Sequence, residues 1–310
     1  MIPVSNGTPE LSELLDLDGD FHVLGTGYRF IEGPVWSPHD QSLMFNDIQF
    51  DSRWRWTEAT GAQLDRRPNW KSNGMTRDVD GELLVCGHVS SDVVRERRDG
   101  SREVLAFHYQ GGYLNSPNDV VVRSDGSVYF TDPDYGRWDH AVGVARPFEL
   151  GFHGVYRIPP GGGDLELLVD RDQFDQPNGL CFSPDESVLY VDDFVGVYAF
   201  PVRPDGGLGS GRLIHDGMSS DENPGDGNPD GMRCDERGNV WVTGRGGVWV
   251  MTGEGDLLGL IRTPEVCANL TWGGPDWHSL FLCTSTSIRM IRTLVGPAPL
   301  ARSRVPAWAS

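Results

Sequence analysis

The sequence lacks any long apolar run. No stretch of its 310 residues approaches the roughly 20 apolar residues that a membrane-spanning helix needs. The first seven residues contain neither a basic region nor an apolar segment, so no secretory signal peptide is expected. These absences predict a protein with no membrane partner.

Positive charge is also scarce. The chain has 26 Lys and Arg against 45 Asp and Glu, which gives a formal net charge of −19. Such a surface repels phosphate backbones, so nucleic acid is not expected as a partner. The same charge is compatible with attraction of a divalent cation. A small-molecule substrate is the expected partner, with a monomer or small homo-oligomer as the assembly.

Cysteine pairs and the usual nucleophile motif are missing. The five cysteines are odd in number and form no close Cys-x-x-Cys pair, which predicts buried thiols in a reducing compartment, the cytoplasm, rather than disulfides or a zinc site. They are Cys86, Cys181, Cys234, Cys267 and Cys283. No Gly-x-Ser-x-Gly sequence occurs, so a serine nucleophile elbow is not supported.

Helix signals are few, whereas turn and strand signals are abundant. The one helical candidate is the stretch from Pro9 to Leu15, which predicts one or two turns. The 40 glycines, 21 prolines and many aromatic residues indicate many short strands separated by turns. The chain is therefore expected to be all-β.

Six segments repeat one pattern: a polar residue, a small residue, an apolar strand, a turn and a second strand. The turns include Asp-Gly pairs, which are strong hairpin signals. The segments start roughly 40 to 60 residues apart, as blades of a propeller do. They start at Glu32, Asn73, Asn118, Asn178, Asp230 and Asn269.

The repeat predicts a six-bladed β-propeller with a metal site in its central channel. We expect the propeller at residues 21–295, with an N-terminal extension at 1–20 and a C-terminal tail at 296–310. The long interval at 133–160 is predicted to be a surface loop inserted into the third blade. A β-sandwich is the alternative, but it would not explain six copies of one unit.

The six residues that open the repeats all carry a side-chain oxygen. The first strand of each hairpin is expected to line the channel, so these oxygens should form a ring around its axis. Carboxylate and amide oxygens suit a hard cation such as Ca²⁺ or Mg²⁺. Asn before Gly is also common in turns, and for Asn73 or Asn178 taken alone a turn is favoured. For Asn269 a structural role that closes the ring is favoured.

Six motifs lie within these segments or next to them. They are Glu32-Gly-Pro-Val-Trp, Asn115-Ser-Pro-Asn-Asp-Val-Val-Val, Tyr129-Phe-Thr-Asp-Pro, Gln176-Pro-Asn-Gly-Leu, Asn228-Pro-Asp-Gly-Met and Ala268-Asn-Leu-Thr-Trp-Gly-Gly. With these motifs the chain resembles the senescence-marker-protein, gluconolactonase and luciferin-regenerating-enzyme superfamily, and most of all its bacterial gluconolactonases. The resemblance covers roughly residues 30–295 in the expected order.

The resemblance implies a propeller with one catalytic divalent ion, usually Ca²⁺, with Mg²⁺, Mn²⁺ and Zn²⁺ as alternatives. Glu32, Asn178 and Asp230 match the metal ligands of the superfamily. Asn118 matches a residue that binds either the ion or the substrate. Asp230 also matches the carboxylate that activates water or attacks the substrate. Two departures, Gly87 where bacterial members commonly have Glu and Ser116 where animal members have Arg, bear on substrate choice.

The predicted activity is hydrolysis of a sugar lactone, such as gluconolactone or xylonolactone. The ion would polarise the carbonyl, and Asp230 would be the catalytic residue. Two carboxylates on one cation have lowered pKa values, which weakens Asp230 as a base, so Asp119 is an alternative base. Substrate contacts are expected from the side chains of Asn73, His88, Asn118 and Tyr135.

Two other functions stay open at this stage. Relatives with the same oxygen ring cleave phosphotriesters or fluoridates, which would require a more apolar channel mouth. A calcium-stabilised propeller without catalytic activity would serve as a binding scaffold. Two carboxylates and four amides at one ring position exceed what a structural ion needs, which favours the enzyme.

Overall fold

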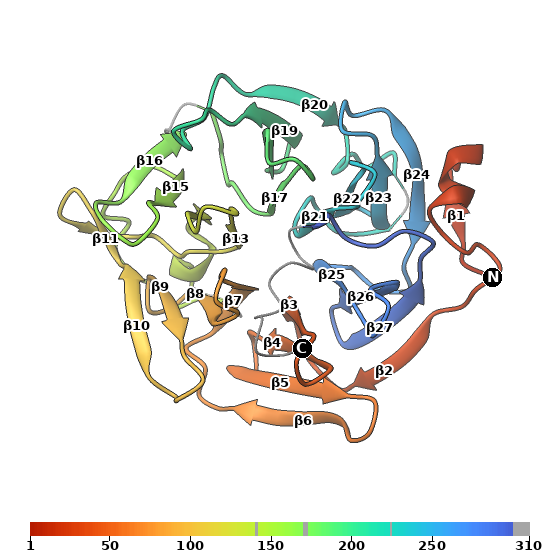
Figure 1. Cartoon of the computed structure of the whole chain (residues 1–310), viewed down its shortest axis with the longest axis horizontal. Helices are drawn as coiled ribbons and strands as arrows, with labels where there is room; N and C mark the ends of the chain where they lie inside the picture. The colour runs from red at the N-terminus through yellow and green to blue at the C-terminus, as the bar shows by residue number, and fades with distance from the viewer. Residues whose placement is uncertain (140–141, 170–172, 224, 300–310) are drawn as a thin grey trace.

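The computed structural model describes residues 1–139, 142–169, 173–223 and 225–299. Six antiparallel sheets are arranged around a central axis, as Figure 1 shows. The prediction of an all-β, six-bladed propeller is therefore confirmed. Among the described residues, no helix is long and apolar enough to cross a membrane. The domain boundaries given above remain predictions, and residues 300–310 of the predicted tail lie outside the described residues.

The first three blades follow one another along the chain. Blade 1 contains β3 (Ile31–Ser37), β4 (Ser42–Asp47), β5 (Ser52–Thr57) and β6 (Gly61–Arg66). Blade 2 contains β7 (Ser72–Arg77), β8 (Leu83–Gly87), β9 (Asp92–Glu96) and β10 (Arg102–Ala106). The short hairpin of β11 (His108–Tyr109) and β12 (Gly112–Tyr113) leads to blade 3. Blade 3 contains β13 (Val120–Val122), β14 (Val128–Asp132), β15 (Gly154–Ile158) and β16 (Glu166–Val169).

The remaining blades use both ends of the chain. Blade 4 contains β17 (Leu180–Phe182), β18 (Val188–Asp192), β19 (Gly196–Pro201) and β20 (Arg212–Asp216). Blade 5 contains β21 (Met232–Cys234), β22 (Val240–Gly244), β23 (Gly247–Met251) and β24 (Leu257–Arg262), and β1 (Val4–Ser5) adds a fifth strand. Blade 6 contains β25 (Asn269–Gly273), β26 (Ser279–Thr284), β27 (Ser287–Arg292) and, outermost, β2 (His22–Thr26).

Strand β2 closes the ring because it comes from the N-terminal part of the chain but pairs with the last strand. His22 lies opposite Met290, and Thr26 lies opposite Ser287. The helical stretch predicted at Pro9 is a 3-10 helix, Pro9–Glu13, and its Leu11 is fully buried. Backbone hydrogen bonds between β27 and β2 therefore fix the chain into a closed ring, which leaves few exposed strand edges.

The predicted hairpin turns form between the first and second strands of the blades. In blade 2, Gly81 takes a φ of +78° and the Asp78 N–H donates to the Glu82 carbonyl at 2.9 Å. In blade 3, Gly126 takes a φ of +89° in the same place. A residue with a Cβ rarely adopts this backbone conformation, so glycine at these positions sets the turn and the register of each hairpin.

The hydrophobic core lies between the blades. Six clusters of buried side chains each join adjacent blades; one of them packs Val35 and Met44 of blade 1 against Met75, Leu83 and Val85 of blade 2. No single sheet could bury both faces alone, so radial packing supplies the apolar burial that stabilises the fold. All five cysteines are buried and free, as predicted.

Candidate active site

The oxygen-bearing residues that open the repeats lie at the start of the innermost strands. Glu32 is the second residue of β3, Asn73 the second of β7 and Asn269 the first of β25. The other three come two residues before their strands: Asn118 before β13, Asn178 before β17 and Asp230 before β21. Equivalent positions in six blades are thereby placed at one end of the channel.

Four of these six positions are followed by a glycine, which allows the blades to approach closely. A Cβ added to Gly33 would lie 2.1 Å from the Asn73 carbonyl oxygen. One added to Gly179 would lie 1.9 Å from the Asp230 carbonyl oxygen. Real Cβ atoms essentially never come this close to backbone, so the backbone of each blade contacts the next at the ring. The polar–small pattern in the sequence therefore has a packing cause.

One cavity of about 540 Å³ lies at this end of the channel. All seven residues predicted to hold the metal or the substrate line it: Glu32, Asn73, His88, Asn118, Tyr135, Asn178 and Asp230. The structure thus brings together side chains from the first five blades. Asn269 does not line the cavity, and its amide donates to Glu32 Oε2 at 2.9 Å.

Glu32 is almost completely buried, with 1 % of its surface exposed. Its Oε2 accepts hydrogen bonds from the Gly33 N–H at 2.6 Å and from Asn269. Burial, followed by repulsion from Asp119, raises the pKa of Glu32 to about 7 although both hydrogen bonds act in the opposite direction. A charged Glu32 is therefore costly unless a further cation lies beside it.

Three more carboxyl groups near the ring are also costly to ionise. Burial raises the pKa values of Asp119, Asp192 and Asp230, and for Asp230 repulsion from Glu32 and the other two adds to the effect. Arg233 contributes one positive charge, with Nη1 3.5 Å from Asp119 Oδ2. One guanidinium is too little for four carboxylates, which favours binding of a cation in the channel.

The ring also holds amide oxygens that suit a hard cation. Asn73 Oδ1 and Asn178 Oδ1 are buried and accept no hydrogen bond from any described residue, which is unusual for buried polar atoms. The described residues contain no cluster of three His, Cys, Asp or Glu side chains suited to a metal. A cation here would depend on amide oxygens together with Glu32 and Asp230, and this donor set fits Ca²⁺ or Mg²⁺.

His88 and Tyr135 form part of the wall above the ring. His88 is buried, and its Nε2 lies 3.1 Å from Asn73 Nδ2. Tyr135 makes edge-to-face contacts with Trp138 at 5.3 Å and with Phe194 at 6.2 Å between ring centroids. Trp138 and Phe194 also line the cavity, so an aromatic wall faces the polar ring.

The long loop of blade 3 supplies Tyr135 and Trp138 of this wall and is fixed by two arginines. Arg137 Nε donates to the Asn115 carbonyl at 2.8 Å, and Arg146 Nη2 donates to the His88 carbonyl at 2.8 Å. The predicted insertion is therefore present between β14 and β15, and it contributes to the channel mouth. Its predicted end at residue 160 is wrong, because residues 154–158 form β15 and pair with β14. His153 lies 3.6 Å from Asp134 within this loop.

Sequence reasoning missed several lining residues and one carboxylate. Ile48, His88 and Phe194 each follow the second strand of their blade, which is the signal that could have identified Ile48 and Phe194. Asp192, the last residue of β18, accepts the Gly179 N–H on Oδ1 at 3.0 Å and is fully buried. Asp119, considered as an alternative base, does not line the cavity and is paired with Arg233.

Comparison with known proteins supports a common architecture and chemistry. The family model described as the SMP-30/Gluconolactonase/LRE-like region matches residues 30–286. A gluconolactonase of Zymomonas mobilis is 28 % identical, over 94 % of this chain and 86 % of its own. A pentonolactonase of Haloferax volcanii is also 28 % identical, over 85 % of this chain and 84 % of its own. The structure of a gluconolactonase of Xanthomonas campestris is 32 % identical, with a TM-score of 0.85 and 94 % of each chain covered.

Proposed function

The chain belongs to the SMP-30/gluconolactonase/LRE-like family, and from that premise we propose that it is a metal-dependent lactonase that opens sugar lactones. The observation that carries the proposal is the cavity in which Glu32, Asn118, Asn178 and Asp230 meet at the channel end. The names of the relatives, gluconolactonase and pentonolactonase, point to an aldonolactone.

A divalent cation, Ca²⁺ in the first place, would be held by Glu32, Asn178 and Asp230, with Asn118 as a further ligand. When bound, it would polarise the lactone carbonyl and stabilise the oxyanion. These residues suit a cation because burial raises the pKa values of Glu32 and Asp230, so a positive charge nearby would stabilise their ionised forms. In addition, Asn178 Oδ1 has no other partner among the described residues.

Asp230 is the proposed catalytic residue. It would either take a proton from the attacking water or attack the carbonyl itself. Its side chain opens to the cavity, whereas Asp119 lies outside the cavity lining and is engaged by Arg233. Burial and the neighbouring carboxylates raise the pKa of Asp230, which opposes the lowering that a cation would cause and keeps it able to accept a proton.

Substrate binding is assigned to the polar ring and the aromatic wall. The amides of Asn73 and Asn118 and the His88 ring would hydrogen-bond to the ring oxygens and hydroxyls of the lactone. Tyr135 would stack on its carbon face, since its ring is fixed against Trp138 and Phe194. The C–H face of a sugar ring suits such an aromatic wall.

The test is proton release from glucono-δ-lactone and xylonolactone, with spontaneous hydrolysis subtracted. The protein is freed of metal and then given Ca²⁺, Mg²⁺, Mn²⁺ or Zn²⁺. We expect activity only with metal, and a loss of at least about a hundredfold in Asp230→Asn. Asp226→Asn, which removes the same charge at an exposed position, should keep full activity.

The panel should also contain a phosphotriester, because Phe30, Ile48, Phe194 and Val266 give the cavity apolar walls. Turnover of the phosphotriester alone would reject the lactonase. A folded protein that binds Ca²⁺ but hydrolyses neither class would favour the binding scaffold instead.

A further inference from the structure

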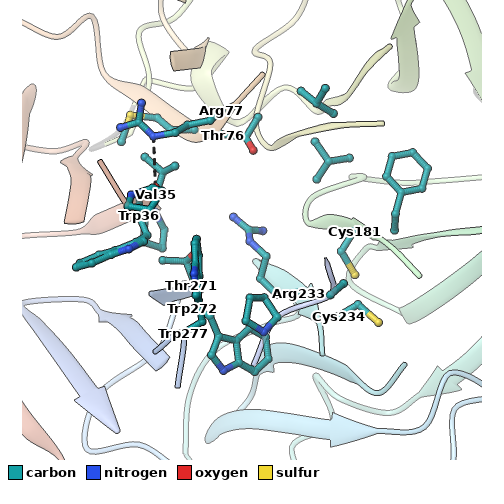
Figure 2. Close-up of a pocket in the computed structure, with 18 of the residues that line it drawn as sticks. Val35, Trp36, Thr76, Arg77, Cys181, Arg233, Cys234, Thr271, Trp272 and Trp277 are labelled. Atoms are coloured by element: carbon teal, nitrogen blue, oxygen red, sulfur yellow. Dashed lines mark hydrogen bonds between the residues drawn. The ribbon is translucent and has the colours of Figure 1, made fainter. Parts of the chain in front are cut away.

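A second cavity, of about 120 Å³, lies at the opposite end of the channel. Most of its lining comes from positions two or more residues further along the same inner strands, and Pro297 and Ala298 add to it. In blade 1, Val35 lies three residues after Glu32. The same spacing separates Thr76 from Asn73 in blade 2 and Arg233 from Asp230 in blade 5. Because a strand rises about 3.3 Å per residue, this cavity is separated from the lactone site by the ring itself. Figure 2 shows its lining residues around the propeller axis.

The chemistry of the second cavity differs from that of the first. Three tryptophans, Trp36, Trp272 and Trp277, contribute to its wall. Two arginines, Arg77 and Arg233, also line it, and no Asp or Glu is among its lining residues in the described part of the chain. Of these two, Arg233 is the one whose guanidinium faces the middle of the cavity, whereas Arg77 donates from Nε to the Trp36 carbonyl at 3.3 Å and from Nη1 to the Gly81 carbonyl at 3.0 Å. With this guanidinium and no carboxylate among its described lining residues, the cavity suits a ligand with a single negative charge.

Arg233 is the central polar group of this cavity. Figure 2 places its guanidinium in the open middle of the ring of lining residues. Nη1 donates to the Met232 carbonyl at 2.6 Å and lies 3.5 Å from Asp119. The Nε and Nη2 groups donate to no acceptor within the described ranges, and only 18 % of the side chain is exposed. A guanidinium offers a planar fork of donors that matches a carboxylate, so part of its capacity remains for a ligand.

We propose that this cavity binds a small organic anion, a carboxylate on an aromatic or similarly flat apolar body. The carboxylate would accept hydrogen bonds from Arg233, and the body would pack against the tryptophans. The cavity of about 120 Å³ is somewhat smaller than an engineered protein cavity of about 150 Å³ that accommodates benzene, so the ligand body can be no larger than one ring. The site is distinct from the lactone cavity, and its existence does not depend on the proposed lactonase activity.

Benzoate is the probe, titrated into the metal-loaded full-length protein by calorimetry and by tryptophan fluorescence. We expect one benzoate per chain and binding at least tenfold weaker for benzamide, which has the same shape without the charge. Arg233→Met should weaken benzoate at least tenfold, and Arg233→Lys should lose less. Arg237→Met removes the same charge at an exposed ion pair with Glu13 and should leave binding unchanged.

A second variant keeps the test decisive if Arg233→Met does not fold. Val121→Phe fills the cavity from β13 without altering Arg233, and it should abolish benzoate binding. Trp138→Ala, in the lactone cavity, should leave benzoate affinity unchanged. Equal binding of benzamide, absence of benzoate binding, or benzoate binding that survives Val121→Phe would each overturn the proposal. None of these results depends on whether the protein hydrolyses lactones.

Discussion

Asn269, the first residue of the last blade's inner strand, donates its side-chain amide to Glu32 in the first blade at 2.9 Å. Its Oδ1 accepts the Leu270 N–H at 2.8 Å, which fixes the direction of the amide. The contact joins blades 6 and 1 at the ring, where their strands share no backbone pairing. It also directs one hydrogen bond at a buried carboxylate.

Replacing Asn269 with alanine should therefore destabilise the metal-free protein. The lost hydrogen bond leaves a buried carboxylate with one donor fewer, which costs about 1–3 kcal/mol of the free energy of unfolding. Urea denaturation with excess chelator measures this value. Asn228→Ala, at an exposed asparagine of the same cavity, should change it by less than about 0.5 kcal/mol. Equal stability of Asn269→Ala and the wild type would remove the structural role of this contact.

Glycine at position 179 is required by the approach of blade 5 to blade 4. In Gly179→Ala the new Cβ would lie 1.9 Å from the Asp230 carbonyl oxygen, so the backbone at the ring must move. We expect a loss of several kcal/mol of stability, as for other overpacked sites, and impaired calcium binding. Thermal unfolding with and without Ca²⁺ tests both.

Gly209→Ala is the matched control in the same blade. Its added Cβ would meet Pro201 at 3.5 Å, an ordinary contact, and neither glycine has a positive φ. Similar stability losses in the two variants would show that the close approach at Gly179 is not the cause.

The sequence predicted this ring well because the repeat places equivalent residues at equivalent strand positions. Periodicity alone brought Glu32, Asn178 and Asp230 to one end of the channel. Periodicity did not distinguish Asn269 from the other five residues of the ring. The repeat could not predict the pairing of Asp119 with Arg233, which are 114 residues apart in the sequence. No local pattern encodes a contact between side chains of different blades, and the burial that shifts the pKa values exists only after the ring has closed.

Asp132 should make the stability of the protein depend on pH. Burial raises its pKa from an ordinary 3.8 to about 7, although Asn115 and Ser116 N–H groups hydrogen-bond to its oxygens at 2.9 and 2.8 Å. The folded state then binds a proton more tightly than the unfolded state. Asp132 thus favours folding at low pH, and this contribution is lost as the pH rises from about 4 to about 7.

Urea denaturation at a series of pH values between 4 and 8 measures this effect against Asp132→Asn. Between pH 4 and 8 we expect the free energy of unfolding to fall less in the variant than in the wild type. An unchanged pH dependence in the variant would mean that Asp132 is ionised throughout, held by its two N–H donors.

The blade 3 loop should affect substrate binding through Arg146. This side chain joins the loop to blade 2, where its Nη2 donates to the His88 carbonyl at 2.8 Å and Nη1 to Ser91 Oγ at 2.9 Å. Arg146→Ala would release the wall that carries Tyr135 without touching Glu32 or Asp230. We therefore expect KM for the lactone to rise several-fold while kcat changes less than twofold. Arg212→Ala, at an exposed ion pair with Glu254, should change neither constant. A fall in kcat with KM unchanged would instead assign the loop a part in the chemical step.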